Sequence, residues 1–274
     1  MNLIKPSYEI IEQKGYDLNS IYKHIELCGR TCYKSEDKIT EDSAEGFVKR
    51  MIDSNHTAML EHGTVYLKLD QYAAQEYMLN PYSRVNYYDS VYYVTTNLRV
   101  IAENDWWNDL SHLCEPTEHH EKRHTVKLTT SIHVYKDLTR HRTMSFAIES
   151  TRYCNYTKGK FGGDLTFIDP VWKKDNHGAY EQFISALHYA NTYYKYLVQA
   201  GWKAEQAAEV LPQCTKADVI ITGFESDWDH MFNLRALGTT GAPHPEVKRI
   251  IEPVMEDFIQ RKWTNIVKTV SGER

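Results

Sequence analysis

One stretch of the chain dominates both its chemistry and its fold: Arg140-His141-Arg142-Thr143-Met144-Ser145-Phe146-Ala147-Ile148-Glu149-Ser150-Thr151-Arg152-Tyr153. It concentrates arginines, a histidine and serines, whose donors suit phosphate and other anionic oxygens. The alternative is a solvated basic face, which is what most arginine clusters form. Apolar residues are interleaved with the charges, and this favours a cleft over an open surface.

The residues before this stretch alternate in the manner of a strand. Every second position is Val126, Leu128, Thr130, Ile132 or Val134, with mostly polar residues between them. Because strand side chains point to opposite faces in turn, the pattern predicts a strand that leads into the basic stretch. A donor-rich turn after such a strand commonly lines a cleft.

The basic stretch resembles the signature of the flavin-dependent thymidylate synthases, Arg-His-Arg-x-x-Ser-x-Asn-Glu-x-Ser-x-Arg. The matching positions are Arg140, His141, Arg142, Ser145, Ser150 and Arg152. The Asn and Glu positions hold Ala147 and Ile148 instead, and Glu149 stands one place later.

The resemblance extends over roughly residues 20 to 255. Residues 28–35 (CGRTCYKS) and 56–62 (HTAMLEH) are similar to the family's N-terminal helix and its histidine-glutamate flavin segment. Residues 205–212 (EQAAEVLP) and 229–235 (DHMFNLR) are similar to its C-terminal flavin and nucleotide segments. Matches at several separate places make a chance motif a poor explanation.

The resemblance implies reductive methylation of dUMP to dTMP, a transferase reaction of nucleotide biosynthesis. Methylenetetrahydrofolate would supply the carbon, NADPH would be the reductant, and FAD would be the bound cofactor. The implied partners are these small molecules, without nucleic acid or membrane. The resemblance also implies a homotetramer whose sites are built from several subunits.

Carried over position by position, the resemblance implies a set of site residues. The dUMP-binding residues would be Asp137, Arg140, Ser150, Arg152 and Arg235, with Ser150 and Arg152 at the phosphate and Arg235 at the uracil ring. The FAD-binding residues would be Cys32, His56, Glu61, Arg140, His141, Arg142 and His230. Arg235 and Arg140 would be catalytic, and no metal is implied. For each residue the alternative is a surface charge or a satisfied core histidine.

Several positions depart from the family pattern. Ala208 stands where the family has an arginine that reaches the nucleotide, and Phe224 and Ser226 stand where it often has Asn and Arg near the flavin. An arginine carries five donors, so its loss is not conservative. Two alternatives therefore stay open. One is flavin-dependent hydroxymethylation of dUMP or dCMP, and the other is a catalytically weakened homologue that binds nucleotide or flavin.

Other constellations have simpler explanations. His120 and His124 have the i, i+4 spacing that can share a metal on a helix, but their charged neighbours favour a solvated loop. A thiol nucleophile needs cationic neighbours, and only Cys154, two residues after Arg152, has them in sequence. We interpret Cys154 as structural, because the family that the chain resembles uses no protein nucleophile.

Composition limits the remaining classes. With 274 residues and 42% hydrophobic content, the chain can bury a core. Its net charge of -5 disfavours RNA binding through the basic stretch. No segment has the length of apolar sequence that a signal peptide or membrane helix requires. The five cysteines fit reduced thiols, so we expect a cytoplasmic protein.

The predicted elements come in a mixed order, which favours an α+β fold over a doubly wound sheet. The family's fold, a twisted mainly antiparallel sheet flanked by helices, agrees. We expect helices at 18–33 (capped by Asn19 or Ser20), 43–52, 180–199, 204–211, 227–237 and 245–259, and strands at 64–69 and 219–222. Without linkers or repeats, residues 1–274 are expected to form a single catalytic domain. An inserted, aromatic-rich subregion of short helices and loops is expected at about 71–121.

Overall fold

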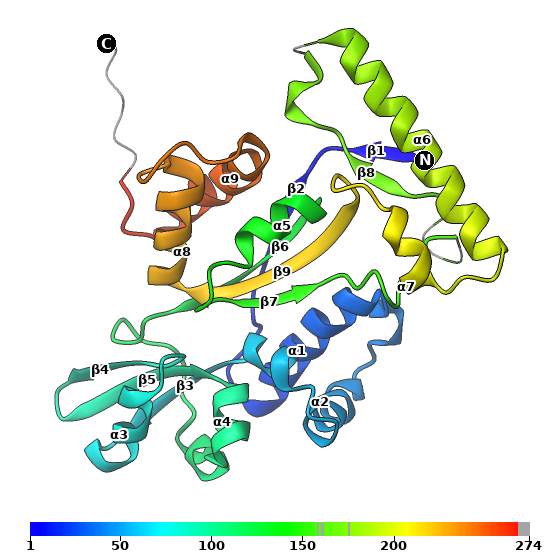
Figure 1. Ribbon diagram of the computed structural model, residues 1–274. Coiled ribbons are helices and arrows are strands. Elements are labelled where there is room, and N and C mark those ends of the chain that lie inside the picture. The colour runs from blue at the N-terminus through cyan, green and yellow to red at the C-terminus, as the bar shows by residue number, and fades with distance from the viewer. Residues whose placement is uncertain (158, 160–161, 175, 268–274) are drawn as a thin grey trace, which may run out of the picture.

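The computed structural model describes residues 1–157, 159, 162–174 and 176–267. It confirms the predicted α+β class. A four-stranded antiparallel sheet has the order β2-β6-β9-β7, a three-stranded antiparallel sheet has the order β3-β5-β4, and β1 pairs with β8 in parallel. Helices flank these sheets (Figure 1). In the described part of the chain, no helix combines the length and the apolar character that crossing a membrane requires.

The elements have the following bounds. The strands are β1 (Asn2–Ile4), β2 (Ser7–Ile11), β3 (Thr64–Leu69), β4 (Arg84–Tyr88), β5 (Val91–Asn97), β6 (Arg123–Ser131), β7 (Ser145–Ile148), β8 (Thr166–Ile168) and β9 (Lys216–Phe224). The helices are α1 (Leu18–Tyr33), α2 (Ser43–Asp53), α3 (Gln71–Leu79), α4 (Leu98–Asn104), α5 (Ile132–Leu138), α6 (His177–Gln199), α7 (Ala204–Ala207), α8 (Glu225–Phe232) and α9 (Pro245–Arg261).

The four-stranded sheet is covered on both faces. Val219 and Ile221 of β9 pack with Trp228 and Phe258, which come from α8 and α9. Ile220, between them in sequence, packs instead with the cysteines of α1. Side chains of β9 therefore alternate between two apolar layers, which explains its nearly continuous burial.

The expectation of short helices and loops at 71–121 was incomplete, because the short helices α3 and α4 are accompanied by two strands. This segment contains β4 and β5, which pair with β3 in the second sheet, seen at the lower left of Figure 1. Tyrosines hid the strand pattern, because Tyr87 and Tyr88 are exposed while Tyr92 and Tyr93 are half-buried. The apolar face of this sheet shares one core with residues of α1, α2, α3 and α4.

Two local expectations also need correction. The predicted strand through Val134 ends at Ser131, whose hydroxyl accepts a hydrogen bond from the Val134 backbone N–H and begins α5. The N-cap of α1 is Asp17, which accepts from the N–H groups of the two residues proposed as caps. A polar side chain that ends a strand or precedes a helix is a better boundary signal than hydrophobic period alone.

The contact between α1 and α2 generates a stability prediction. A Cβ atom on the buried Gly29 would lie 2.6 Å from Phe47 Cζ, whereas one on the exposed Gly46 would meet only Arg50 Nη1 at 3.5 Å. We expect Gly29→Ala to lower the free energy of unfolding by about 1–3 kcal/mol, measured by urea denaturation. The matched control Gly46→Ala should raise it by roughly 0.5–1 kcal/mol. Equal effects at the two positions would contradict this packing.

Candidate functional site

The turn between α5 and β7 meets the end of α8 at an open hollow of about 470 Å³. Arg235 Nε donates to His141 Nε2 at 3.2 Å, and its Nη2 donates to the Asp137 carbonyl at 3.1 Å. Arg140 is largely exposed, with Nη1 3.3 Å from Asp137 Oδ1. His230 is also exposed, and its ring centroid lies 5.6 Å from that of His141. We call these five residues the Arg235 cluster.

His141 is held neutral in this cluster. Burial, and next the charge of Arg235, lower its pKa to about 4. Because Nε2 accepts the hydrogen bond from Arg235, the ring proton belongs on Nδ1. His141 therefore orients the guanidinium without adding a charge to the hollow.

Arg235 projects from a π-helical turn, Asn233–Leu237, that continues α8. Such turns widen a helix locally and are frequent at functional sites. Gly238 ends the turn at φ 69°, where a Cβ would lie 2.8 Å from Pro243 Cδ. Only glycine fits this position without strain.

A second group of expected residues lies beyond the other end of β7. Ser150 N donates to the Cys32 carbonyl at 3.1 Å, so the end of α1 holds this turn. Arg152 is mostly exposed, with Nε 3.5 Å from Oε2 of Glu205 in α7. Ala208, the position of the missing family arginine, follows α7 directly. We call Cys32, Ser150 and Arg152 the Arg152 cluster.

Cys32 enters this cluster through its backbone. Its side chain is buried, and burial raises the pKa of the thiol to about 12. The thiol is therefore protonated at neutral pH and is a poor nucleophile. Cys154 is buried as well, which suits the structural role proposed for it.

Glu149 does not replace the glutamate that the signature has at position 148. Its carboxylate accepts from Lys216 Nζ at 2.7 Å, from Asp218 N at 3.1 Å and from Tyr156 Oη at 3.2 Å. Ala147 packs against α1, and Ile148 packs on the opposite face of the sheet. The usually polar positions of the motif therefore serve the core in this chain.

The expected histidine-glutamate segment forms a 3₁₀ turn, Thr57–His62, preceded by the exposed His56. Glu61 Oε1 is 2.5 Å from Arg99 Nη1 of α4. The Glu61 carbonyl accepts from Arg123 Nη1 at 3.0 Å. This turn thus joins α4 to β6, while Arg142 lies exposed in the turn before β7.

A single chain brings only some of the expected residues together. The Arg235 cluster is connected by direct contacts, but the Arg152 cluster lies at the opposite end of β7. The four residues of that strand span ~13 Å. Arg152 and Arg235 therefore share no contact partner among the described residues. His56 and Glu61 form a third group.

The sequence interpretation missed Arg123, the first residue of β6. Its side chain is buried, and within the described residues its guanidinium bonds uncharged partners: the Glu61 carbonyl and the hydroxyls of Thr64 and Ser145. Burial lowers its pKa to about 10, and Nε has no hydrogen-bond partner in the described part of the chain. An arginine opening a buried strand was the only sequence signal.

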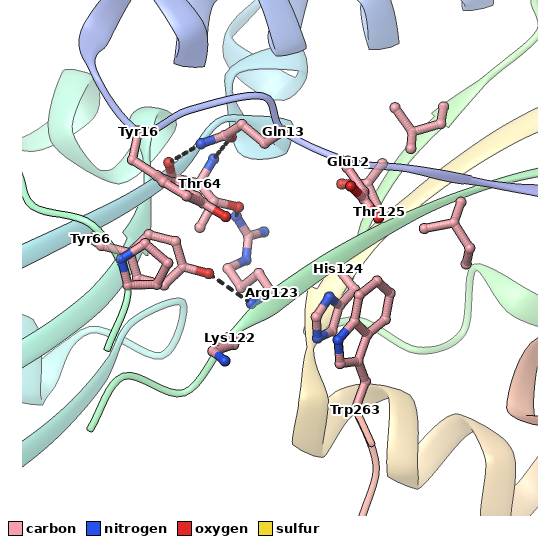
Figure 2. Close-up of a pocket in the computed structure, with 13 residues that line it drawn as sticks. Glu12, Gln13, Tyr16, Thr64, Tyr66, Lys122, Arg123, His124, Thr125 and Trp263 are labelled. Atoms are coloured by element: carbon pink, nitrogen blue, oxygen red, sulfur yellow. Dashed lines mark hydrogen bonds between the residues drawn. The ribbon is translucent and has the colours of Figure 1, made fainter. Parts of the chain in front are cut away.

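Arg123 also borders a cavity of about 270 Å³ between β2, β3 and β6 (Figure 2). Its backbone N–H donates to Tyr66 Oη, and the ring of Trp263 stacks on His124 at 3.9 Å. His120 is buried and contacts the Leu67 carbonyl at 3.1 Å. The two histidines considered for a metal therefore lie in a turn and a strand, not on one helix.

A buried polar chain crosses the sheet next to Arg123. His24 Nε2 contacts Thr125 Oγ1 at 3.1 Å, that hydroxyl contacts Thr222 Oγ1 at 2.8 Å, and Thr222 contacts His62 Nδ1 at 2.8 Å. Burial lowers the pKa of His24 to about 4 and that of His62 to about 3. Both rings are neutral in the folded protein.

Comparison with known proteins identifies the family. The family model Thy1, described as thymidylate synthase complementing protein, matches residues 113–261. The chain belongs to this family. The match includes the basic stretch and the segments after it.

Two curated relatives are named flavin-dependent thymidylate synthase. The protein of Pyrococcus furiosus is 30% identical over 136 residues, 47% of this chain and 54% of the relative. That of Pyrococcus abyssi is 25% identical over 125 residues, 46% of this chain and 49% of the relative. The chain spans about half the length of the curated relatives it matches.

Solved structures of a UMP/dUMP methylase, PolB, from Streptomyces cacaoi are also similar. The structure bound with 5-Br dUMP has a TM-score of 0.49 and 17% identity, covering 95% of this chain and 93% of that chain. The structure bound with 5-Br UMP has a TM-score of 0.49 and 16% identity, covering 94% and 91%.

The buried histidines generate a pH prediction. An unfolded histidine titrates near 6.5, so the unfolded state binds protons that folded His24 and His62 exclude. Their contribution is fully present above pH 6.5 and is lost as the pH falls from 6.5 toward 4. We expect urea denaturation to report a loss of about 2 kcal/mol for each ring by pH 5. His24→Asn should remove roughly half of that loss of stability. A free energy of unfolding that stays constant between pH 7 and pH 5 would contradict the burial of the two rings.

Proposed function

We propose that the protein is a flavin-dependent thymidylate synthase. It methylates dUMP reductively to dTMP, with FAD as cofactor, methylenetetrahydrofolate as carbon donor and NADPH as reductant. Family membership supports the reaction class, and the Arg235 cluster is the observation that carries the proposal. There a neutral histidine and a carbonyl aim a guanidinium beside an open hollow.

The donor set fits the proposed cofactor. FAD carries a diphosphate, and the unpaired Nε of the buried Arg123 marks a region where an anion would be stabilised. We assign FAD binding to Cys32 through its backbone, His56, Glu61, Arg140, His141, Arg142 and His230. When bound, the flavin supplies hydride transfer.

The substrate roles follow from donor chemistry. Ser150 and Arg152 would hold the dUMP phosphate, since guanidinium grips phosphate with two bonds and a hydroxyl adds a third. Arg235 and Arg140 would face the uracil oxygens, where positive charge stabilises the electron-rich ring that attacks the methylene carbon. Asp137, which contacts both of these arginines, would keep them in place.

Separation of the two clusters supports an assembled site. Arg152 is exposed and Ser150 is half-buried at one end of β7, and the Arg235 cluster lies at the other end. We propose a homotetramer in which the Arg152 cluster of one copy faces the Arg235 cluster of another.

Product identity tests the reaction. The protein is incubated with dUMP or dCMP, methylenetetrahydrofolate and NADPH, and the product nucleotide is weighed by mass spectrometry. A methylated uracil nucleotide supports the proposal. A hydroxymethyl product would establish the alternative reaction, and absence of turnover would indicate a weakened homologue.

Arg152→Lys tests the phosphate assignment. Lysine keeps the charge but loses the forked geometry, so affinity for dUMP should fall about 10-fold while flavin content stays constant. Equilibrium titration with dUMP measures the affinity, and flavin absorbance measures the flavin content. Unchanged dUMP affinity would count against the assignment.

Ala208→Arg is the converse test. It restores a guanidinium next to α7, close in sequence to the Glu205 that pairs with Arg152. We expect tighter dUMP binding or a changed preference between dUMP and dCMP, measured by the same titration. If neither the dUMP affinity nor the preference between dUMP and dCMP changes, position 208 does not face the nucleotide.

Complementation between inactive variants tests the assembled site. Arg152→Ala and Arg235→Ala should each abolish turnover, but co-expressed copies should regain about a quarter of wild-type activity, because some sites receive both intact arginines. The separately expressed variants, mixed without subunit exchange, are the control. Co-expressed protein that stays inactive while assembled would indicate that both arginines act within one copy.

A further inference from the structure

The second sheet brings an arginine to a place where the family pattern is broken. Arg84 of β4 has its guanidinium carbon 4.5 Å from the centroid of the Phe224 ring. The guanidinium carbon of Arg123 lies 5.3 Å from the same centroid. Phe224 and the nearby Ser226 occupy the positions at which the resemblance leads us to expect Asn and Arg near the flavin.

Direct contacts link this place to the segments assigned to flavin. Asp227 Oδ1 accepts from Thr143 Oγ1 at 2.8 Å, and it lies 3.7 Å from Arg84 Nη2. Thr143 follows Arg142 in the basic turn. Arg123 reaches Ser145 at the start of β7 and the Glu61 carbonyl. Asp227 therefore links Arg84 to the basic turn. Phe224 and Arg123 link Arg84 to the Glu61 turn.

The guanidinium of Arg84 is held by two backbone carbonyls and lies within ion-pair distance of two carboxylates. Its Nη1 donates to the carbonyls of Pro81 at 3.1 Å and Ser83 at 3.0 Å. The carboxylates of Glu121 and Asp227 lie at 3.6 and 3.7 Å, beyond ordinary hydrogen-bond distance. The Arg84 side chain is 30% exposed, so a ligand can reach it.

The carboxylates near Arg84 are occupied by other donors. Asp227 accepts from Thr143 and from the Phe224 backbone N–H, and Glu121 accepts from the Ser226 backbone N–H. Among the described residues Arg123 hydrogen-bonds uncharged groups, so a second guanidinium lies beside Phe224 without a direct carboxylate partner. A planar, stacked guanidinium is the side chain best suited to a diphosphate.

We propose that Arg84, supplied by the β3-β5-β4 sheet, binds the diphosphate of FAD in place of the arginine missing at position 226. This inference rests on the proposed function and deepens it. The aromatic-rich subregion then has a role, because it completes the cofactor site of a chain that has Phe224 and Ser226 where Asn and Arg are expected.

Binding of FAD and riboflavin by the full-length, flavin-free chain tests this role. Riboflavin has no phosphate, so removing a phosphate contact should not affect it. We expect Arg84→Gln to weaken FAD binding about 10-fold or more and leave riboflavin binding unchanged, as measured by quenching of flavin fluorescence. Arg84→Lys should recover part of the loss. The matched control is Arg50→Gln, on the exposed face of α2, which should bind both flavins like the wild type.

Other outcomes would overturn the inference. An equal loss for FAD and riboflavin would show that Arg84 acts by holding the second sheet in place, and a thermal melt would then report destabilisation. Unchanged FAD binding would exclude a contact between Arg84 and the diphosphate. Wild-type protein that binds no flavin would overturn the proposed function, and this inference with it.

Discussion

The pairing of β9 with both β6 and β7 is the constraint on which the site depends. Thr222 of β9 pairs with Thr125 on one side and with Ser145 on the other. Both neighbours run antiparallel to β9, so they run parallel to each other, and the chain must return along the sheet between Ser131 and Ser145. Such a crossover needs about a dozen residues. Helix α5 and the basic turn provide it, and this places the Arg235 cluster and the Arg152 cluster at opposite ends of β7.

The same sheet accounts for the departures from the family motif. Ala147 is buried against α1, and Ile148 is half-buried and packs toward α8 and α9, so both motif positions serve the core. Glu149, the only acid close to the motif position, is engaged by Lys216. The polar groups that the motif has at positions 147 and 148 are therefore absent from the middle of this strand, and the arginines of the basic stretch lie beyond its two ends.

Local signals allowed much of the fold to be predicted. The bounds of α1 and β3 agree with the structure, because each has a clear hydrophobic period between polar boundaries. β4 and β5 were missed because their tyrosines lie on both faces of a partly exposed sheet. Within the site, the basic turn was visible in sequence. The roles of Arg123 and Glu149 depend on partners far along the chain, at Glu61 and Lys216, which no local pattern encodes.

The π-helical turn at Asn233–Leu237 makes the position of Arg235 sensitive to the deletion of one residue. A turn of this kind accommodates one residue more than an α-helical turn would. Deleting a single residue there would let the helix run on with regular hydrogen bonding, and the fold would gain regularity. The arginine would then swing by about 100° around the axis, away from His141. The irregular turn thus sets the direction of the Arg235 side chain, and a regular helix would point that side chain away from His141.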